Sequence, residues 1–172
     1  MKKFKAFIAL DATNNKKNIE VVKKLHKLVY GFKVGYRSFY NKDSDKLITE
    51  IKRKKSKLFL DLKLHDIPNT VGSAIESLKN INPDFLTLHI SGGEEMLKSA
   101  LKNIKKFNLK TKVLGVTLLT SLDGKDSKKI YGEKDTDKSI KKLALIASNA
   151  KIAGLILSLI HISEPTRPER IS

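Results

Sequence analysis

Asp61 and Lys63 lie two residues apart in an apolar stretch and are the clearest candidates for chemistry in this sequence. Leu58–Leu62 has the pattern of a buried parallel strand, and side chains two apart on a strand point to the same face. Unpaired charges are costly in a protein interior, so this acid and base form either a structural ion pair or part of a site. Asp66 follows just past the strand, and Pro68 suits the first turn of a helix. These residues alone leave both interpretations open.

The strands and helices that would position these side chains alternate along the chain. Strands are expected at Phe7–Leu10, Phe32–Val34, Leu58–Lys63, Phe85–Ile90 and Lys112–Thr117, with the start of a sixth at Ala153–Leu157. Helices are expected at about 16–29, 44–54, 69–80, 94–106 and 138–150, with a loop over Asp123–Asp137. Repeated units of this kind predict an α/β fold in which helices cover a parallel sheet.

The positions of the polar residues favour a (β/α)8 TIM barrel over an open doubly wound sheet. Five of them lie at or just beyond the ends of different strands: Asp11, Lys33, Lys63, Ser91 and Thr120. Barrel enzymes place their catalytic groups at these carboxyl ends. A complete barrel usually takes about 250 residues, and this chain has 172. We therefore expect an incomplete barrel of about five and a half βα units.

The segment Asp61–Thr70, Asp-x-Lys followed by His-Asp-Ile-Pro-Asn-Thr, resembles the signature of the orotidine 5′-phosphate decarboxylase family. Four further motifs resemble that family in the same order: Phe7–Asp11, Phe32–Gly35, Leu86–Gly93 and Val113–Ser121. Together the motifs cover about residues 5–155. The resemblance implies a homodimeric TIM barrel that converts orotidine 5′-phosphate to UMP in pyrimidine biosynthesis, with neither a cofactor nor a metal.

The resemblance also implies a role for each matching residue. An alternating network of two lysines and two carboxylates forms the catalytic set: Lys33, Asp61, Lys63 and Asp66. Lys63 would stabilise the carbanion left at C6 of the pyrimidine and then protonate it, while Asp61 would lie against the substrate carboxylate. Asp66 and Thr70 would reach the active site of the partner subunit. Six residues would bind the substrate: Asp11, Lys33, Asp61, Ile67, Thr70 and Thr120.

The chain is strongly basic, with a formal net charge of +17. Its lysines are scattered along the expected helices, and aromatic residues do not alternate with them, so we expect no nucleic acid partner. No apolar run reaches the ~18 residues of a membrane span, and the N-terminus shows no signal-peptide pattern. We therefore expect a cytoplasmic protein without a membrane partner. The absence of cysteine excludes disulfides and thiolate chemistry.

The last fifteen residues differ from the rest of the chain, because they contain two arginines and two prolines but no lysine. The string Leu157–Arg167 resembles the translation of a sequencing-library adapter. We expect a partial decarboxylase domain over residues 1–156 and a non-native tail over residues 157–172. The resemblance places the phosphate-binding loops after the seventh and eighth strands, so we expect residues 1–172 by themselves to be inactive.

Two other functions stay open. A Mg²⁺-dependent sugar-phosphate decarboxylase or aldolase of the same superfamily, such as 3-keto-gulonate-6-phosphate decarboxylase or hexulose-6-phosphate synthase, shares Asp-x-Lys-x-x-Asp but lacks the His-Asp-Ile-Pro-Asn-Thr continuation. A basic nucleic-acid-binding domain is the alternative from another class, and its binding would depend on salt. His65 and His89 could be interpreted as acid–base groups, but we expect structural roles for them.

Overall fold

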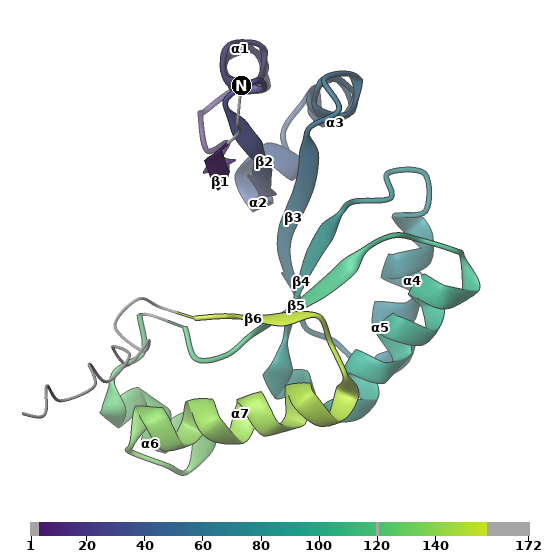
Figure 1. Cartoon of the computed structure of the whole chain (residues 1–172). Helices are drawn as coiled ribbons and strands as arrows, with labels where there is room; N and C mark the ends of the chain where they lie inside the picture. The colour runs from purple at the N-terminus through teal and green to yellow at the C-terminus, as the bar shows by residue number, and fades with distance from the viewer. Residues whose placement is uncertain (1–3, 120, 158–172) are drawn as a thin grey trace, which may run out of the picture.

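The computed structural model describes residues 4–119 and 121–157, which form one curled sheet of six parallel strands with helices around it. The strands lie side by side in chain order: β1 (Phe4–Ala9), β2 (Val29–Gly35), β3 (Lys57–Leu64), β4 (Phe85–His89), β5 (Lys112–Val116) and β6 (Gly154–Ile156). The helices are α1 (Asn15–Leu25), α2 (Tyr36–Phe39), α3 (Ser44–Arg53), α4 (Pro68–Ser77), α5 (Glu94–Lys106), α6 (Gly124–Tyr131) and α7 (Thr136–Ala150), with a short 3₁₀ turn η1 (Ile90–Gly92). Figure 1 shows the longer helices α1, α3, α4, α5 and α7 on the convex side of the sheet, whose two outer strands are β1 and β6.

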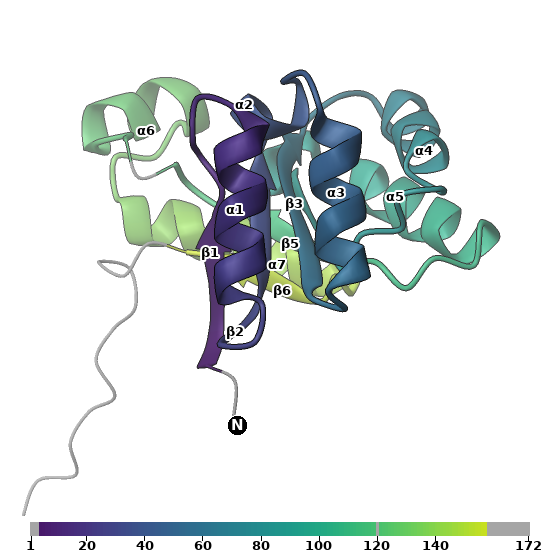
Figure 2. The same ribbon diagram turned by 90° about the horizontal axis from the view of Figure 1, so that it is seen from above.

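Alternation along each strand separates a helix-facing side from a concave side. Leu58, Leu60 and Leu62 of β3 are buried in the main apolar core, together with Ile51 of α3 and Ile75 of α4. The residues between them on β3 point the other way, because successive side chains of a strand face opposite sides. Figure 2 shows α1 and α3 lying side by side over the N-terminal strands. The sheet therefore presents its charged positions away from the helices.

An aromatic cluster fills the concave side at the level below these charged positions. The rings of Phe7, Phe59 and Phe85 meet edge to face, with centroids 5.4 to 6.1 Å apart. Gly31 of β2 is required here, because a Cβ at this position would lie 2.6 Å from the Phe7 ring and 2.2 Å from the Lys57 carbonyl oxygen. Edge-to-face packing of this kind adds to the stabilisation from buried area. The aromatic cluster therefore lies directly below the charged positions on the concave side.

The expected incomplete TIM barrel is confirmed, and the expected strands agree with the structure to within a few residues. Three details were wrong. The four-residue helix α2 was not expected. The helix expected over 16–29 ends at Leu25, because the chain turns there and β2 already begins at Val29. The loop expected over Asp123–Asp137 contains α6, which begins where the Asp123 carboxylate accepts hydrogen bonds from two backbone N–H groups.

Some expectations fall outside the described residues. Thr120 and the tail from residue 158 onward belong to this group, so the interpretation of the tail stays a prediction. In the part of the chain that the structure describes, no helix is both long enough and apolar enough to cross a membrane.

Candidate active site

Three charged side chains meet on the concave side, at the carboxyl ends of two neighbouring strands. Lys33 of β2 donates from Nζ to Asp61 Oδ2 at 3.1 Å, and Lys63 of β3 donates from Nζ to Asp61 Oδ1 at 2.8 Å. The Asp61 side chain is only 11% exposed, whereas the two lysine side chains are about one third exposed, at 32% and 30%. The carboxylate is thus held from two sides, while both ammonium groups stay accessible. Three of the four expected catalytic residues are brought together.

The electrostatics of Asp61 favour its charged form. Burial would raise the pKa of the Asp61 carboxyl, but hydrogen bonds from Lys63 and Lys33, together with their positive charges, outweigh burial and lower the pKa below its ordinary value. The carboxylate is therefore ionised at neutral pH. A fixed negative charge between two partly exposed cations can orient both of them toward a bound anionic substrate.

A local break in the sheet sets the direction of Lys63. In the β3–β4 pairing, Leu60 lies opposite Leu86 and Leu64 lies opposite Leu88. Over this interval β3 advances by four residues while β4 advances by two, so the register shifts. Lys63 has a φ of +42°, in the left-handed region that residues other than glycine rarely adopt. Irregularities of this kind often occur next to active sites, where they redirect a side chain.

Thr87 of β4 makes side-chain hydrogen bonds at this irregularity. The sequence alone did not identify Thr87 as a residue of the site. Its Oγ1 accepts a hydrogen bond from the Lys63 backbone N–H at 2.8 Å and donates one to Asp61 Oδ1 at 3.0 Å. The Thr87 residue has no exposed surface. A threonine between leucines is an ordinary strand residue, so only the position of β4 beside β3 reveals its contacts.

Asp11 lies at the same end of the sheet, just after β1. A Cβ placed on Gly35 would be 4.0 Å from Asp11 Oδ1, so the Asp11 carboxylate lies close to the end of β2. The turn after Asp11 is held by Asn18, whose Oδ1 accepts from the Ala12 N–H at 3.2 Å and whose amide donates to Ser38 Oγ at 3.0 Å. Asn18 and Ser38 are both buried. This polar network fixes the turn that carries Asp11.

Asp66, Ile67 and Thr70 lie further along, on the turn into α4. All three are exposed, and the Asp66 carboxylate accepts a hydrogen bond from the Ile67 N–H at 2.7 Å. Among the described residues, Asp66 forms no ion pair with either lysine of the site. Within one chain, Asp66 therefore does not join the predicted network with Lys33, Asp61 and Lys63. Exposure leaves these side chains available to another molecule.

His65 and His89 lie beside the charged cluster, with ring centroids 5.2 Å apart. Burial, and then the neighbouring charges of His65 and Lys63, lower the pKa of His89 below its ordinary value. His89 is therefore neutral at pH 7. Tyr36 donates from its hydroxyl to the Leu62 carbonyl at 2.5 Å, and burial raises the pKa of this hydroxyl.

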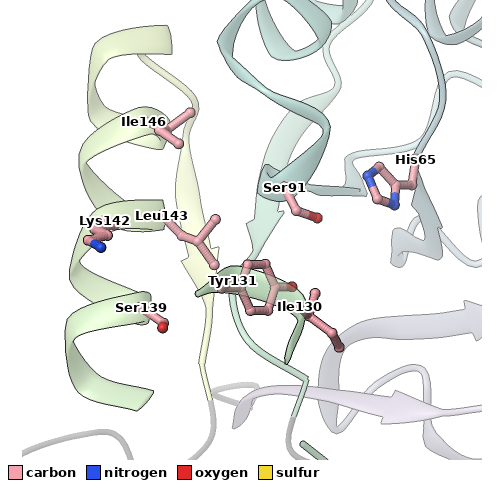
Figure 3. A pocket seen from close by; sticks show the side chains of 8 residues that line it. All are labelled: His65, Ser91, Ile130, Tyr131, Ser139, Lys142, Leu143 and Ile146. Carbon is pink, nitrogen blue, oxygen red and sulfur yellow. The ribbon is translucent and has the colours of Figure 1, made fainter. Parts of the chain in front are cut away.

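A cavity of about 510 Å³ opens next to His65. Figure 3 shows His65 and Ser91 on one side of it, with side chains of α6 and α7 on the other. The residues that line it are His65, Ser91, Ile130, Tyr131, Ser139, Lys142, Leu143 and Ile146. The three charged residues of the site do not line this cavity. The cavity is therefore separate from the charged cluster and lies beside it, at His65.

Known proteins resemble this chain along most of its length. A family profile described as "Orotidine 5'-phosphate decarboxylase / HUMPS family" matches residues 5–165. An orotidine 5′-phosphate decarboxylase from Fusobacterium nucleatum is 38% identical over 162 residues, which cover 94% of this chain and 68% of the relative. One from Carboxydothermus hydrogenoformans is 40% identical over 153 residues, which cover 86% and 62%. The crystal structure of the enzyme from Lactobacillus acidophilus matches with a TM-score of 0.77 at 32% identity, over 90% of this chain and 71% of that chain.

The curled parallel sheet with charged groups at its carboxyl edge defines a class of protein, the (β/α) barrel enzymes that act on substrates at that edge. Within this class, the chain belongs to the orotidine 5′-phosphate decarboxylase / HUMPS family.

Proposed function

We propose that this site serves the decarboxylation of orotidine 5′-phosphate to UMP. The observation that carries the proposal is the Asp61 carboxylate held between Lys33 and Lys63, in a chain of this family. The reaction needs a fixed cation where negative charge develops and a proton donor at the same place. Lys63 can supply both, because its ammonium group is partly exposed and aimed by Asp61.

The proposed chemistry uses only groups of this chain. The bond from C6 to the carboxylate breaks, CO2 leaves, and the electron pair stays at C6. The Lys63 ammonium stabilises that pair and then transfers a proton to C6, after which the lysine takes up a proton from water. Asp61 lies against the departing carboxylate, and their repulsion is relieved when neutral CO2 forms. Thr87 Oγ1 hydrogen-bonds both the Asp61 carboxylate and the Lys63 backbone N–H.

The substrate-binding roles are proposed from the resemblance to the family, and the geometry supports them only for the described residues. Asp11 and Lys33, at the ends of neighbouring strands, would bind the ribose, and Thr120 would contact the pyrimidine. Asp66, Ile67 and Thr70 are exposed beyond the site, which supports the proposal that Asp66 and Thr70 complete the active site of a partner subunit in a homodimer. The cytoplasmic location expected from the sequence also stays a prediction.

A Mg²⁺-dependent sugar-phosphate enzyme is the second candidate within the superfamily. Asp61, the first acid of the shared Asp-x-Lys-x-x-Asp motif, already has one oxygen contacted by Lys33 and the other by Lys63 and Thr87. No group of three or more potential ligands in the described residues could hold a metal ion. Activity that survives EDTA would favour the metal-free reaction, whereas loss that Mg²⁺ restores would favour the second candidate. A nucleic-acid-binding domain would instead bind random DNA in a salt-dependent way and would not bind UMP.

The catalytic assignment is tested with a version of the chain extended over the remaining length of its relatives. CO2 released from carboxyl-labelled orotidine 5′-phosphate is compared between this parent and its Lys63→Ala variant. We expect the variant to lose the activity and to keep the circular dichroism spectrum of the parent. A variant that retains a tenth or more of the parent rate would show that Lys63 is not the proton donor.

A further inference from the structure

The backbone N–H of Lys63 lies at the irregular end of β3, and its hydrogen-bond partner is a side chain. Between Leu60 and Leu64, β3 has two more residues than the facing part of β4, so regular pairing is interrupted there. The N–H of Lys63 lies in this interval, in a left-handed backbone conformation. An N–H that is partly shielded from water gains from an acceptor, so an acceptor outside the regular pairing stabilises the conformation of Lys63. Thr87 Oγ1, at 2.8 Å, is that acceptor.

The hydrogen-bond directions at Thr87 follow from its chemistry. A backbone N–H can only donate, so the hydroxyl accepts from Lys63. Its single proton is then directed to Asp61 Oδ1, at 3.0 Å. The same Asp61 oxygen accepts from the Lys63 ammonium at 2.8 Å. Backbone, hydroxyl, carboxylate and ammonium thus form a closed ring of contacts through Lys63, Thr87 and Asp61.

We propose that Thr87 is a positioning residue, whose hydroxyl holds the Lys63 backbone in its left-handed conformation and fixes the Asp61 carboxylate against the Lys63 ammonium. This role deepens the proposed function, on which its catalytic meaning rests. Thr87 lies between the two reacting groups without needing to touch the substrate, because its hydroxyl is buried and both of its hydrogen-bonding capacities are used. A shift of about 1 Å in such a group can cost about 10²-fold in rate.

The test compares Thr87→Val, which keeps the shape but removes the hydroxyl, with Thr87→Ser, which keeps the hydroxyl. Thr111→Val is the matched control, because Thr111 is also buried and its hydroxyl also donates one hydrogen bond, in this case to the Pro83 backbone carbonyl at 2.6 Å, just before the start of β5. Two NMR measurements on the 172-residue chain report on the ring: the titration of the Asp61 side-chain carboxyl and the hydrogen exchange of the Lys63 amide.

In Thr87→Val we expect the Asp61 carboxyl to titrate at a higher pH than in the parent, because its charged form has lost a donor. We expect the Lys63 amide to exchange at least about tenfold faster, because it has lost its acceptor. Thr87→Ser should restore both values, and Thr111→Val should change neither. Unchanged titration and exchange in Thr87→Val would overturn the proposal.

Two further outcomes are distinguishable. If Thr87→Val does not fold, the hydrogen exchange of the Lys63 amide in the parent chain is the test. Exchange as fast as that of an exposed loop amide would contradict the hydrogen bond to Thr87, and slow exchange would support it. If the extended version shows neither UMP binding nor decarboxylation, the proposed function fails. The titration of Asp61 and the exchange of Lys63 still decide the structural role of Thr87 in that case.

Discussion

Replacing Lys63 by glycine should give a more stable protein than replacing it by alanine, the reverse of what an ordinary strand position shows. Lys63 has a φ of +42°, and a left-handed residue with a Cβ costs roughly 1–2 kcal/mol that glycine avoids. Glycine loses about 0.5–1 kcal/mol to alanine in a regular strand. The difference leaves glycine ahead by about 0.5–1 kcal/mol at this position. Both variants lose the contact with Asp61 equally, so the comparison isolates the backbone.

Lys57 provides the matched control, because it is a lysine of the same strand, is paired with Asp84 at 2.6 Å, and is not among the residues with positive φ. There, Lys57→Gly should be about 0.5–1 kcal/mol less stable than Lys57→Ala. Urea unfolding gives the four free energies, and thermal unfolding should show a shift of roughly 2–4 °C per kcal/mol. If glycine is the weaker residue at both positions by the same margin, the left-handed conformation of Lys63 is refuted.

Three further predictions address burial, packing and assembly. The pKa of His89 is lowered in the folded chain, so below pH ~6.5 the unfolded chain binds a proton more readily at this residue than the folded chain does. The free energy of unfolding should therefore fall from pH 7 to pH 5. The urea midpoint of the His89→Gln variant should fall less over the same range. Gly31→Ala places a methyl group against backbone and ring atoms and should cost about 2–3 kcal/mol of unfolding free energy, whereas Gly35→Ala, with nothing nearer than 4.0 Å, should cost less. In the extended version, mixing inactive Lys63→Ala and Asp66→Ala proteins should restore part of the activity through hybrid dimers, and a mixture that stays inactive after verified subunit exchange would argue against a shared site.

Much of the site could be predicted from the sequence, because period-two alternation places Asp61 and Lys63 on one face of a strand. The contact between Asp61 and Lys33 follows from parallel strands whose carboxyl ends share one edge. The role of Thr87 could not be predicted, because its contacts depend on the interrupted pairing between β3 and β4. No local sequence pattern indicates that interruption.

The missed helix α6 has a different cause. Its segment is short and rich in charges of both signs, so it lacks a clear apolar stripe, and glycine residues at both ends made it look like a loop. The signal that could have found it is the Asp123 side chain at its start, with Gly132 in a left-handed conformation after its end.

Lys33, Asp61 and Lys63 are proposed to form the nucleotide site, and an NMR titration with UMP of the chain extended over the remaining length of its relatives tests this most directly. Binding should perturb the signals of these three residues in a saturable way, and Asp61→Asn should weaken the effect because the two lysines lose the charge that aligns them. Thr111→Val should titrate like the parent. Saturable perturbations confined to other parts of the chain, or none at millimolar UMP, would contradict the account.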